Sequence, residues 1–282
     1  MSLAAAVPRP EALRLNARFV EQVLTGFIRD ETLRAGMKRV VVGLSGGVDS
    51  ALAACLARRA LGRDGVVAVL MPYRLSDPAS SKDARMLARR LGIRAETVDI
   101  TPMVDAWLAL DPKASRIRKG NKMARERMSI LYDRSVVHEA LVLGTSNKTE
   151  LLLGYGTIHG DMASSINPIG DLYKTQVRQM AVHVKVPAAI RRKVPTADLW
   201  PSQTDEKELG FSYEKLDRLL RLLVDERGSR AGALAAGWPR AMVDRVIARI
   251  VRSQYKRRLP LIAKISDRTV GVDFRYPRDW GT

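Results

Sequence analysis

Four short runs of apolar residues, separated by longer amphipathic stretches, constrain the fold of this chain most strongly. The runs have the length of buried strands, and they cover residues 39–44, 66–71, 94–100 and 140–144. Helical periodicity marks the stretches between them, at residues 48–61, 80–91 and 116–138. Strands that alternate with helices in this way form a parallel sheet with helices on both faces. We therefore predict a Rossmann-like α/β fold, in which ligands bind beyond the carboxyl ends of the strands.

The remainder of the chain is expected to be mainly helical. An amphipathic helix is indicated between Leu13 and Ile28, and further helical patterns cover residues 174–185, 212–226 and 240–255. Residues 187–208 contain three prolines and are interpreted as a loop. No stretch has the composition of a linker, so we predict one domain over residues 1–282 with a helical C-terminal portion.

Composition limits the class of partner. The formal net charge of +18 attracts polyanions, which include nucleic acids but also ATP and dinucleotides. Because the 48 lysines and arginines are spread along the chain, anionic small molecules are favoured over nucleic acid, with a general surface bias toward arginine as the alternative. A single cysteine, Cys55, excludes an intrachain disulfide, and no apolar run has the length of a membrane span. We therefore expect a cytoplasmic protein without a membrane partner.

The string G-L-S-G-G-V-D-S at residues 43–50 is the strongest indication of function. Its paired glycines allow a sharp turn between a strand and a helix, and the N–H groups at the start of that helix favour an anion. Its serines can add hydroxyl donors. Asp49 would repel a bare phosphate but suits a Mg²⁺ ion that bridges the two. The alternative is an ordinary strand–helix turn with Asp49 near the helix cap.

The S-G-G-V-D-S part of this loop resembles the signature of the N-type ATP pyrophosphatases, which cleave ATP between its α and β phosphates. It differs from a Walker loop, because no lysine follows the second glycine. The resemblance implies the adenine nucleotide α-hydrolase type of α/β fold. It also implies that the whole loop binds ATP, namely Gly43, Leu44, Ser45, Gly46, Gly47, Val48, Asp49 and Ser50.

Further blocks resemble one family of this superfamily, the NAD⁺ synthetases, in their ammonia-dependent form. They include K-G-N-K-M-A-R-E-R-M-S from Lys119, G-T-S-N-K-T-E-L-L-L-G-Y-G from Gly144 and P-I-G-D-L-Y-K-T-Q-V from Pro168. The strings K-V-P-T-A-D-L-W, Q-T-D-E-K-E-L-G-F-S-Y and Q-Y-K-R-R-L-P follow in the family's order. Together these blocks cover most of the chain from Gly43 to Pro260.

This resemblance implies an enzyme that forms a carbon–nitrogen bond. Nicotinic acid adenine dinucleotide (deamido-NAD) would attack ATP through its carboxylate to give an acyl-adenylate and pyrophosphate, and ammonia would then displace AMP. Two anionic substrates must meet, so catalysis should depend on charge neutralisation and positioning. The alternatives are a pyrophosphatase that acts on another carboxylate or on RNA, and a nucleotide-binding protein without activity. RNA-thiolating relatives usually need paired cysteines, and this chain has one.

The same resemblance implies roles for residues around ATP. Asp49 and Glu150 would hold Mg²⁺, which takes hard oxygen ligands. Thr145 and Thr196 would contact ATP through their hydroxyls, and Lys174 would bind its phosphates. For Glu150 and Lys174 the alternative is a solvated surface charge, and for the two threonines it is helix capping. Asp49 and Lys174 are expected to be catalytic.

On the substrate side, the resemblance implies that Arg127, Asp161, Tyr255 and Lys256 bind deamido-NAD. Asp161 lies in a G-D turn beside the reacting carboxylate and would be the third catalytic residue. Arg127 could instead belong to the general positive face of its helix.

Three positions depart from the pattern of many ammonia-dependent members. Ile158 stands where those proteins offer a lysine, Ser165 where they have an aspartate, and Tyr255 where they have a histidine. All three are substrate-side positions, and the strings around Ile158 and Tyr255 look like the synthetase domain of glutamine-using enzymes. Either the other substrate-side residues suffice to hold deamido-NAD, or the natural substrate differs.

The nitrogen donor is expected to be free ammonia. Glutamine-using members carry an additional amidase domain with a catalytic cysteine, whereas only 42 residues precede the phosphate loop here. The chain is therefore expected to use ammonia directly or to receive it from a separate glutaminase. The resemblance also implies a homodimer whose substrate site is shared across the interface.

Overall fold

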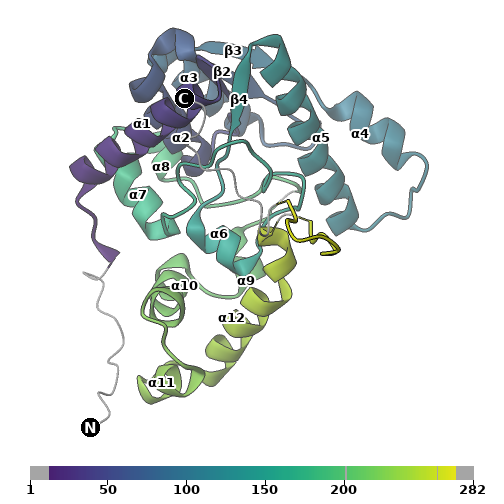
Figure 1. The fold of residues 1–282 in the computed structure, drawn as a ribbon. Coiled ribbons are helices and arrows are strands. Elements are labelled where there is room, and N and C mark those ends of the chain that lie inside the picture. The colour runs from purple at the N-terminus through teal and green to yellow at the C-terminus, as the bar shows by residue number, and fades with distance from the viewer. Residues whose placement is uncertain (1–12, 201, 259, 271–282) are drawn as a thin grey trace.

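The computed structural model describes residues 13–200, 202–258 and 260–270, and a parallel sheet lies at its centre (Figure 1). Its strands are β1 (Arg39–Gly43), β2 (Val66–Leu70), β3 (Arg94–Thr97) and β4 (Ala140–Leu143), in the order β3-β2-β1-β4. Each pairing is parallel, so the carboxyl ends of the strands meet at one edge of the sheet. The predicted parallel α/β fold is confirmed.

One face of the sheet is covered by α2 (Val48–Leu61), which is itself enclosed. Residues 50–57 of α2 are all buried, because the helix lies between the sheet and the outer helices α1 (Ala17–Arg34) and α7 (Lys174–His183). The small side chains of its A-L-A-A-C segment allow this close approach. α3 (Pro78–Leu91) packs beside α2 in the same layer.

The opposite face is covered by α5 (Arg116–Val137), which has 22 residues. Val41 of β1 and Val142 of β4 pack there against Met128 and Leu131 of α5. α4 (Thr101–Leu108) packs against α5 and extends the layer outward (Figure 1). Since helices cover both faces, the prediction of a doubly covered sheet is also confirmed.

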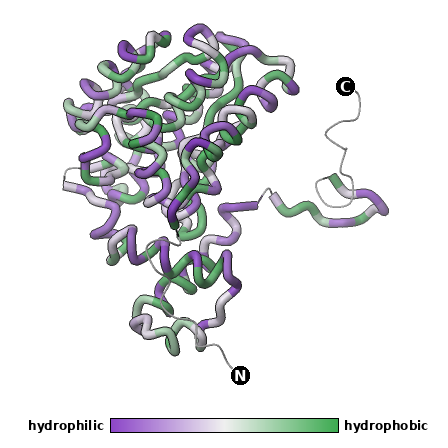
Figure 2. Tube along the Cα trace, turned by 90° about the vertical axis from the view of Figure 1, so that its left-hand side faces the viewer, coloured by the Kyte–Doolittle hydropathy of each residue, from purple (hydrophilic) through white to green (hydrophobic). Residues whose placement is uncertain are grey.

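The predicted helical C-terminal portion forms a second core below the sheet in the view of Figure 1. It comprises α10 (Tyr213–Leu220), a π-helical turn (Arg221–Asp225), α11 (Arg230–Ala235), α12 (Arg240–Arg252) and a 3₁₀ turn (Gln254–Arg257). Leu216 and Leu219 of α10 pack with Val243 and Val246 of α12. In Figure 2 this portion is a separate group of turns beneath the larger body, and the described residues after it run away from the body.

Residues 187–208 differ from the predicted loop at both ends. α8 (Ala188–Arg191) lies near the start of this segment, and α9 (Asp205–Leu209) begins before its end. Helices of four and five residues are too short to show a readable period, which is why periodicity does not predict them. α4 and α11 are likewise not predicted by periodicity.

The two cores contact each other through α6 (Lys148–Leu153) and α7, which both pack against α10. The interpretation of residues 1–282 as one domain stays a prediction. Within the described part of the chain, no helix has both the length and the apolar character needed to cross a bilayer.

The helical C-terminal portion approaches α6 closely at Gly154. This glycine ends α6 with a φ of +61°, and a Cβ built there would lie 2.1 Å from Cβ of Ser253. Gly92 ends α3 with a φ of +63°, and a Cβ there would have no atom within 4 Å. We expect Gly92→Ala to lower the free energy of unfolding by about 1–2 kcal/mol, the penalty of a left-handed backbone. Gly154→Ala should lower it clearly more, because Ser253 must move.

Denaturant unfolding of the two glycine variants measures that difference. Equal losses of unfolding free energy would contradict the close contact between α6 and the end of α12.

Candidate active site

The loop after β1 has the geometry of a phosphate-binding turn. Gly46 has a φ of +80°, and a Cβ there would lie 2.3 Å from the carbonyl oxygen of Ser80 in α3, so only glycine fits. Ser50 Oγ donates to the Gly47 carbonyl (3.1 Å), and the Gly47 N–H donates to Ser45 Oγ (3.2 Å). The loop leads into α2, whose N-terminus carries a positive partial charge. The predicted strand, turn and helix are all present.

Lys174 lies between two carboxylates beside this loop. Its Nζ donates to Asp49 Oδ2 (2.6 Å) and to Glu150 Oε1 (3.2 Å). Only 3% of the Lys174 side chain is exposed, against 17% for Asp49 and 16% for Glu150. The three residues come from the first turns of α7, α2 and α6. The fold thus brings together the residues that the sequence analysis assigns to phosphate and metal binding, and none of them is a solvated surface charge.

Burial and charge act in opposite directions within this cluster. Burial raises the pKa of Glu150, and the ammonium of Lys174 opposes that rise. Burial by itself lowers the pKa of Lys174, but the charges of Asp49 and Glu150 raise it above its ordinary value. When both carboxylates are ionised, the cluster carries one negative charge in excess, and a bound cation would neutralise it and favour the ionised form of Glu150.

Asn147 holds the two carboxylates in place and was not identified by the sequence analysis. Its Nδ2 donates to Asp49 Oδ1 (2.9 Å), and its backbone N–H donates to Glu150 Oε2 (3.1 Å). Its Oδ1 accepts the Glu150 N–H (3.0 Å), which completes a capping box at the start of α6. The N-x-x-E spacing of such a box is visible in the sequence, but the contact with Asp49 joins residues 98 positions apart.

A third carboxylate, that of Asp205, lies near Lys174. Asp205 is 4% exposed and accepts hydrogen bonds from the hydroxyls of Tyr213 (2.9 Å) and Tyr155 (3.0 Å). Lys174 Nζ lies 5.1 Å from the centroid of the Tyr213 ring. Burial raises the pKa of Asp205, and the charge of Lys174 opposes this rise. Asp205 lies in the string Q-T-D-E-K-E-L-G-F-S-Y, but the sequence gives no signal for its burial, which arises only from tertiary packing.

Asp161 forms a second charged site with two basic residues. Its Oδ1 accepts the Thr157 N–H (2.7 Å), and its backbone carbonyl accepts the hydroxyl of Ser146 (3.0 Å). Burial raises the pKa of Asp161, whereas the positive charges of Lys256 and Arg127 lower it. The substrate-side residues Arg127, Asp161 and Lys256 therefore share one electrostatic environment.

The two basic residues of this group are held by backbone carbonyls. Arg127 Nε donates to the Met71 carbonyl beyond the end of β2 (3.0 Å). Lys256 Nζ donates to the carbonyls of Gly154 (2.9 Å) and Gly156 (2.7 Å). Arg127 is thus directed toward the carboxyl edge of the sheet, and Lys256 toward the segment that leads from α6 to Asp161.

Known proteins resemble this chain over almost its whole length. The NAD synthase family model matches residues 20–260. The NH(3)-dependent NAD(+) synthetase of Trichlorobacter lovleyi is 54% identical over 269 residues, which are 95% of this chain and 98% of that protein. The chain belongs to the NAD synthase family.

Solved structures agree with membership of the NAD synthase family. An NMN synthetase from Francisella tularensis superimposes with a TM-score of 0.78 and 33% identity, over 89% of this chain and 99% of that one. An NH3-dependent NAD synthetase from Campylobacter jejuni gives a TM-score of 0.76 and 32% identity, over 89% of this chain and 100% of that one.

Three further residues predicted to bind ligands differ in their exposure to solvent. Thr196 is exposed, and its hydroxyl accepts the Asp198 N–H (3.1 Å). Tyr255 is 62% exposed, whereas Thr145 is half-buried at the end of β4. The assignments of Thr145, Thr196 and Tyr255 to ligands stay predictions.

The two other positions that depart from the NAD synthetase pattern make local contacts. Ser165 pairs with β4, because its N–H donates to the Val142 carbonyl (2.9 Å) and its hydroxyl accepts the Val142 N–H (3.3 Å). The Ile158 carbonyl accepts a hydrogen bond from Arg125 Nε (3.2 Å). The hydroxyl of Ser165 is therefore engaged in a hydrogen bond with the backbone of β4.

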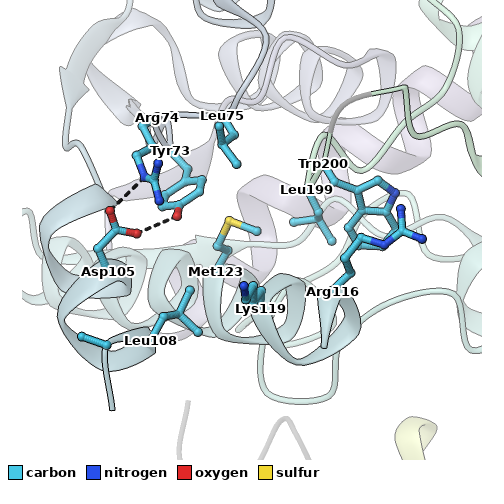
Figure 3. A pocket seen from close by; sticks show the side chains of 11 residues that line it. Tyr73, Arg74, Leu75, Asp105, Leu108, Arg116, Lys119, Met123, Leu199 and Trp200 are labelled. Carbon is cyan, nitrogen blue, oxygen red and sulfur yellow. Dashed lines mark hydrogen bonds and ion pairs between the residues drawn. The ribbon is translucent and has the colours of Figure 1, made fainter. Parts of the chain in front are cut away.

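A hollow of about 540 Å³ opens between α4, the first half of α5 and Trp200 (Figure 3). The guanidinium of Arg116 lies 5.8 Å from the Trp200 ring. On the other side, the Tyr73 hydroxyl donates to Asp105 (2.6 Å), which also pairs with Arg74 (2.9 Å). Aromatic rings beside cations suit a nucleotide, since the rings stack on a base and the cations attract phosphate.

Asn147→Ala is expected to destabilise the protein more than Asn16→Ala does. Both side chains cap a helix, because Asn16 Oδ1 accepts the Phe19 N–H (3.2 Å) and Asn147 Oδ1 accepts the Glu150 N–H (3.0 Å). Loss of a cap lowers the free energy of unfolding by about 1 kcal/mol. Loss of the Asn147 amide also leaves Oδ1 of the half-buried Asp49 without its donor, although Oδ2 keeps the hydrogen bond from Lys174, and this adds about 1–3 kcal/mol.

Denaturant unfolding of the two asparagine variants checks this expectation. A loss for Asn147→Ala no larger than that for Asn16→Ala would contradict the proposed support of Asp49.

Proposed function

We propose that this chain makes NAD⁺ by amidating deamido-NAD with ammonia, in a reaction that converts ATP into AMP and pyrophosphate. The observation that carries the proposal is the buried cluster of Asp49, Lys174 and Glu150 beside the phosphate loop, in a member of the NAD synthase family. The relatives named NH3-dependent NAD synthetases support ammonia as the nitrogen donor.

The chemistry divides into two substitutions. In the first, a carboxylate oxygen of deamido-NAD attacks the α-phosphorus of ATP, the α–β bridge breaks, and pyrophosphate leaves. In the second, ammonia attacks the acyl carbon, AMP leaves, and one proton is released. Lys174 suits the first step, because a buried ammonium that remains protonated can stabilise the charge that moves onto pyrophosphate.

Mg²⁺ is proposed to bind at Asp49 and Glu150. Among residues 13–200, 202–258 and 260–270, no group of three or more histidine, cysteine, aspartate or glutamate side chains is arranged to hold a metal by itself. Mg²⁺ fits the present donors, because it commonly binds one or two carboxylates and completes its ligands with phosphate oxygens and water. When bound, the ion would supply charge neutralisation for the phosphates.

The substrate carboxylate is proposed to lie near Asp161. Arg127 and Lys256 are the cations that share the surroundings of Asp161, so they are suited to bind the anionic parts of a pyridine nucleotide. The hollow of Figure 3 adjoins the same end of the sheet, and its rings and cations suit the adenosine part of a nucleotide.

A second candidate substrate is nicotinic acid mononucleotide. The Francisella tularensis protein named NMN synthetase has the same fold as this chain, so fold alone does not separate a mononucleotide from a dinucleotide. We favour the dinucleotide, because the relatives at 54% and 55% identity are named NAD(+) synthetases.

A homodimer in the reducing cytoplasm is proposed as the working form. Apolar side chains are exposed on α1, where Phe19 is 60% and Val23 is 50% exposed, and at the end of α5, where Val136 is 79% exposed. Burial of such side chains against a second copy would remove apolar area from water. The single cysteine, Cys55, is buried, and burial raises the pKa of its thiol to about 11, so it stays protonated and unreactive.

Asp49→Asn is expected to lower the rate of pyrophosphate release about 10²–10³-fold, the usual effect of removing one preorganised electrostatic contact. The amide keeps the size of the side chain but removes the charge that faces Lys174. A coupled phosphate assay with ATP and deamido-NAD measures the rate. Asp244→Asn is the matched control, because Asp244 is an exposed partner of Arg230 far from the loop in sequence. A near-parental rate for Asp49→Asn would contradict the assignment.

The parent protein is expected to form NAD⁺ from deamido-NAD and ATP only when ammonium is present, with a higher kcat/KM than for nicotinic acid mononucleotide. Chromatography of the products, with transfer RNA as a control substrate, checks this. Faster turnover of the mononucleotide would establish the second candidate. A KM for ammonium in the low millimolar range would exclude the need for a separate glutaminase.

A further inference from the structure

Two aspartates of the helical C-terminal portion each join the start of α6 to the start of α7. Asp217 lies in α10, and Asp225 ends the π-helical turn that follows. Neither residue belongs to the site described above. The two helices that they join carry Glu150 and Lys174.

Asp217 makes the inner connection. It is completely buried, and its Oδ1 accepts the Thr149 hydroxyl (2.6 Å) while its Oδ2 accepts the Thr175 N–H (2.8 Å). The Thr149 hydroxyl oxygen in turn accepts the backbone N–H of Lys174 (3.0 Å). One carboxylate thus fixes the neighbour of Glu150 on α6 and, on α7, the backbone at Lys174 and Thr175.

Asp225 makes the outer connection. Its Oδ1 accepts a hydrogen bond from Lys148 Nζ (2.8 Å), and its Oδ2 accepts the hydroxyl of Tyr173 (3.0 Å). Lys148 is the first residue of α6, and Tyr173 immediately precedes α7. The outer connection therefore repeats the inner one at neighbouring positions of the same two helices.

The π-helical turn accounts for both aspartates reaching the same helices. On an α-helix of 3.6 residues per turn, positions eight residues apart differ by about 80° around the axis. The turn Arg221–Asp225 is wider than an α-helical turn, so it rotates less per residue and brings Asp225 back toward the face of Asp217. Such single π-turns occur frequently at functional sites.

We propose that Asp217 and Asp225 form an aspartate clasp, whose function is to set the spacing between Glu150 and Lys174 for the first step of the proposed reaction. The inference rests on the proposed function. Both aspartates are positioning residues, because they act through α6 and α7.

Stability alone is a poor explanation for the inner aspartate. The groups that act on the Asp217 carboxylate are the hydroxyls of Thr149 and Thr175, the Thr175 N–H and the like charge of Glu214, with no cation among them in the described part of the chain. Its neighbours Leu216 and Leu219 are buried apolar residues. Removing an ionisable side chain from water carries a desolvation cost, and replacing buried ionic groups by well-packed apolar residues is often neutral or stabilising. What an apolar residue could not do is fix two helix starts by directional hydrogen bonds.

The decisive variants are Thr149→Val and Thr149→Ser. Valine has the shape of threonine without the hydroxyl, so it breaks the link between Asp217 and Lys174, whereas serine keeps that link. With saturating ATP and deamido-NAD, well below the melting temperature, we expect Thr149→Val to release pyrophosphate about 10- to 100-fold more slowly than the parent. Thr149→Ser should stay within about threefold of the parent, and the KM for ammonium should be unchanged in both.

The aspartates themselves provide a second test. Asp217→Asn replaces one acceptor by a donor, so its rate of pyrophosphate release should fall as much as that of Thr149→Val. The rate of Asp225→Asn should fall less, because 35% of the Asp225 side chain is exposed. Asp244→Asn, an exposed carboxylate of the same helical portion, should retain the parental rate. If Asp217→Asn does not fold, the Thr149 pair decides.

Four outcomes overturn the clasp. Two of them concern the rate of pyrophosphate release by the Thr149 variants: a rate for Thr149→Val within twofold of the parent, or a rate for Thr149→Ser as low as that for Thr149→Val. The third is a fall in rate for Asp244→Asn equal to that for Asp217→Asn. The fourth is a rise in the KM for ammonium of Thr149→Val as large as the fall in its kcat. A parent that releases no pyrophosphate would instead refute the proposed function. The increase in melting temperature caused by ATP with Mg²⁺ then tests the clasp: retention in Thr149→Ser with loss in Thr149→Val supports it, and equal increases overturn it.

Discussion

The ammonium of Lys174, placed between the carboxylates of Asp49 and Glu150, is the interaction on which the candidate site depends. It is made at 2.6 Å and 3.2 Å by a side chain that is almost completely buried. Removing one partner of a buried ion pair typically costs about 3–5 kcal/mol, because the remaining charge is left in a poor solvent. The cluster is therefore held only if three separate helices arrive in the correct register. The sheet and the helical C-terminal portion both position the starts of these three helices.

The parallel sheet provides the first part of that register. β1 and β4 are neighbours, so the chain leaves them at the same edge and enters α2 and α6 close together. Asn147 then joins the two helix starts, since its amide binds Asp49 and its backbone binds Glu150. The N-terminus of α2 adds a positive partial charge beside the glycine loop, which favours phosphate groups.

The helical C-terminal portion provides the second part. It contributes none of the three charged groups of the cluster, but its contacts surround them. Tyr213 lies against Lys174 and donates to Asp205 of the preceding helix α9, and Asp217 binds the backbone at the start of α7. Lys256, just after α12, reaches back to the loop at Gly154 that leads to Asp161. The sheet thus presents the phosphate loop, while the helical portion holds the residues opposite it.

Local sequence determined the elements and the chemistry of the loop. The strand β1, the turn at Gly46 and Gly47, and the helix α2 follow from short-range rules of size, period and backbone freedom, and the structure has them where the sequence predicts them. The blocks around Glu150 and Lys174 were informative only through their resemblance to a family. Tertiary structure alone decided which polar and charged groups meet: the contact of Asn147 with Asp49 spans 98 positions, and that of Lys174 with Asp49 spans 125. It also decided the burial of Asp205 and Asp217, because a charged residue on a short helix has the same local sequence signal whether it faces water or a core. Hydrogen bonds to distant helices make the difference, and those depend on how the sheet and the helical portion pack.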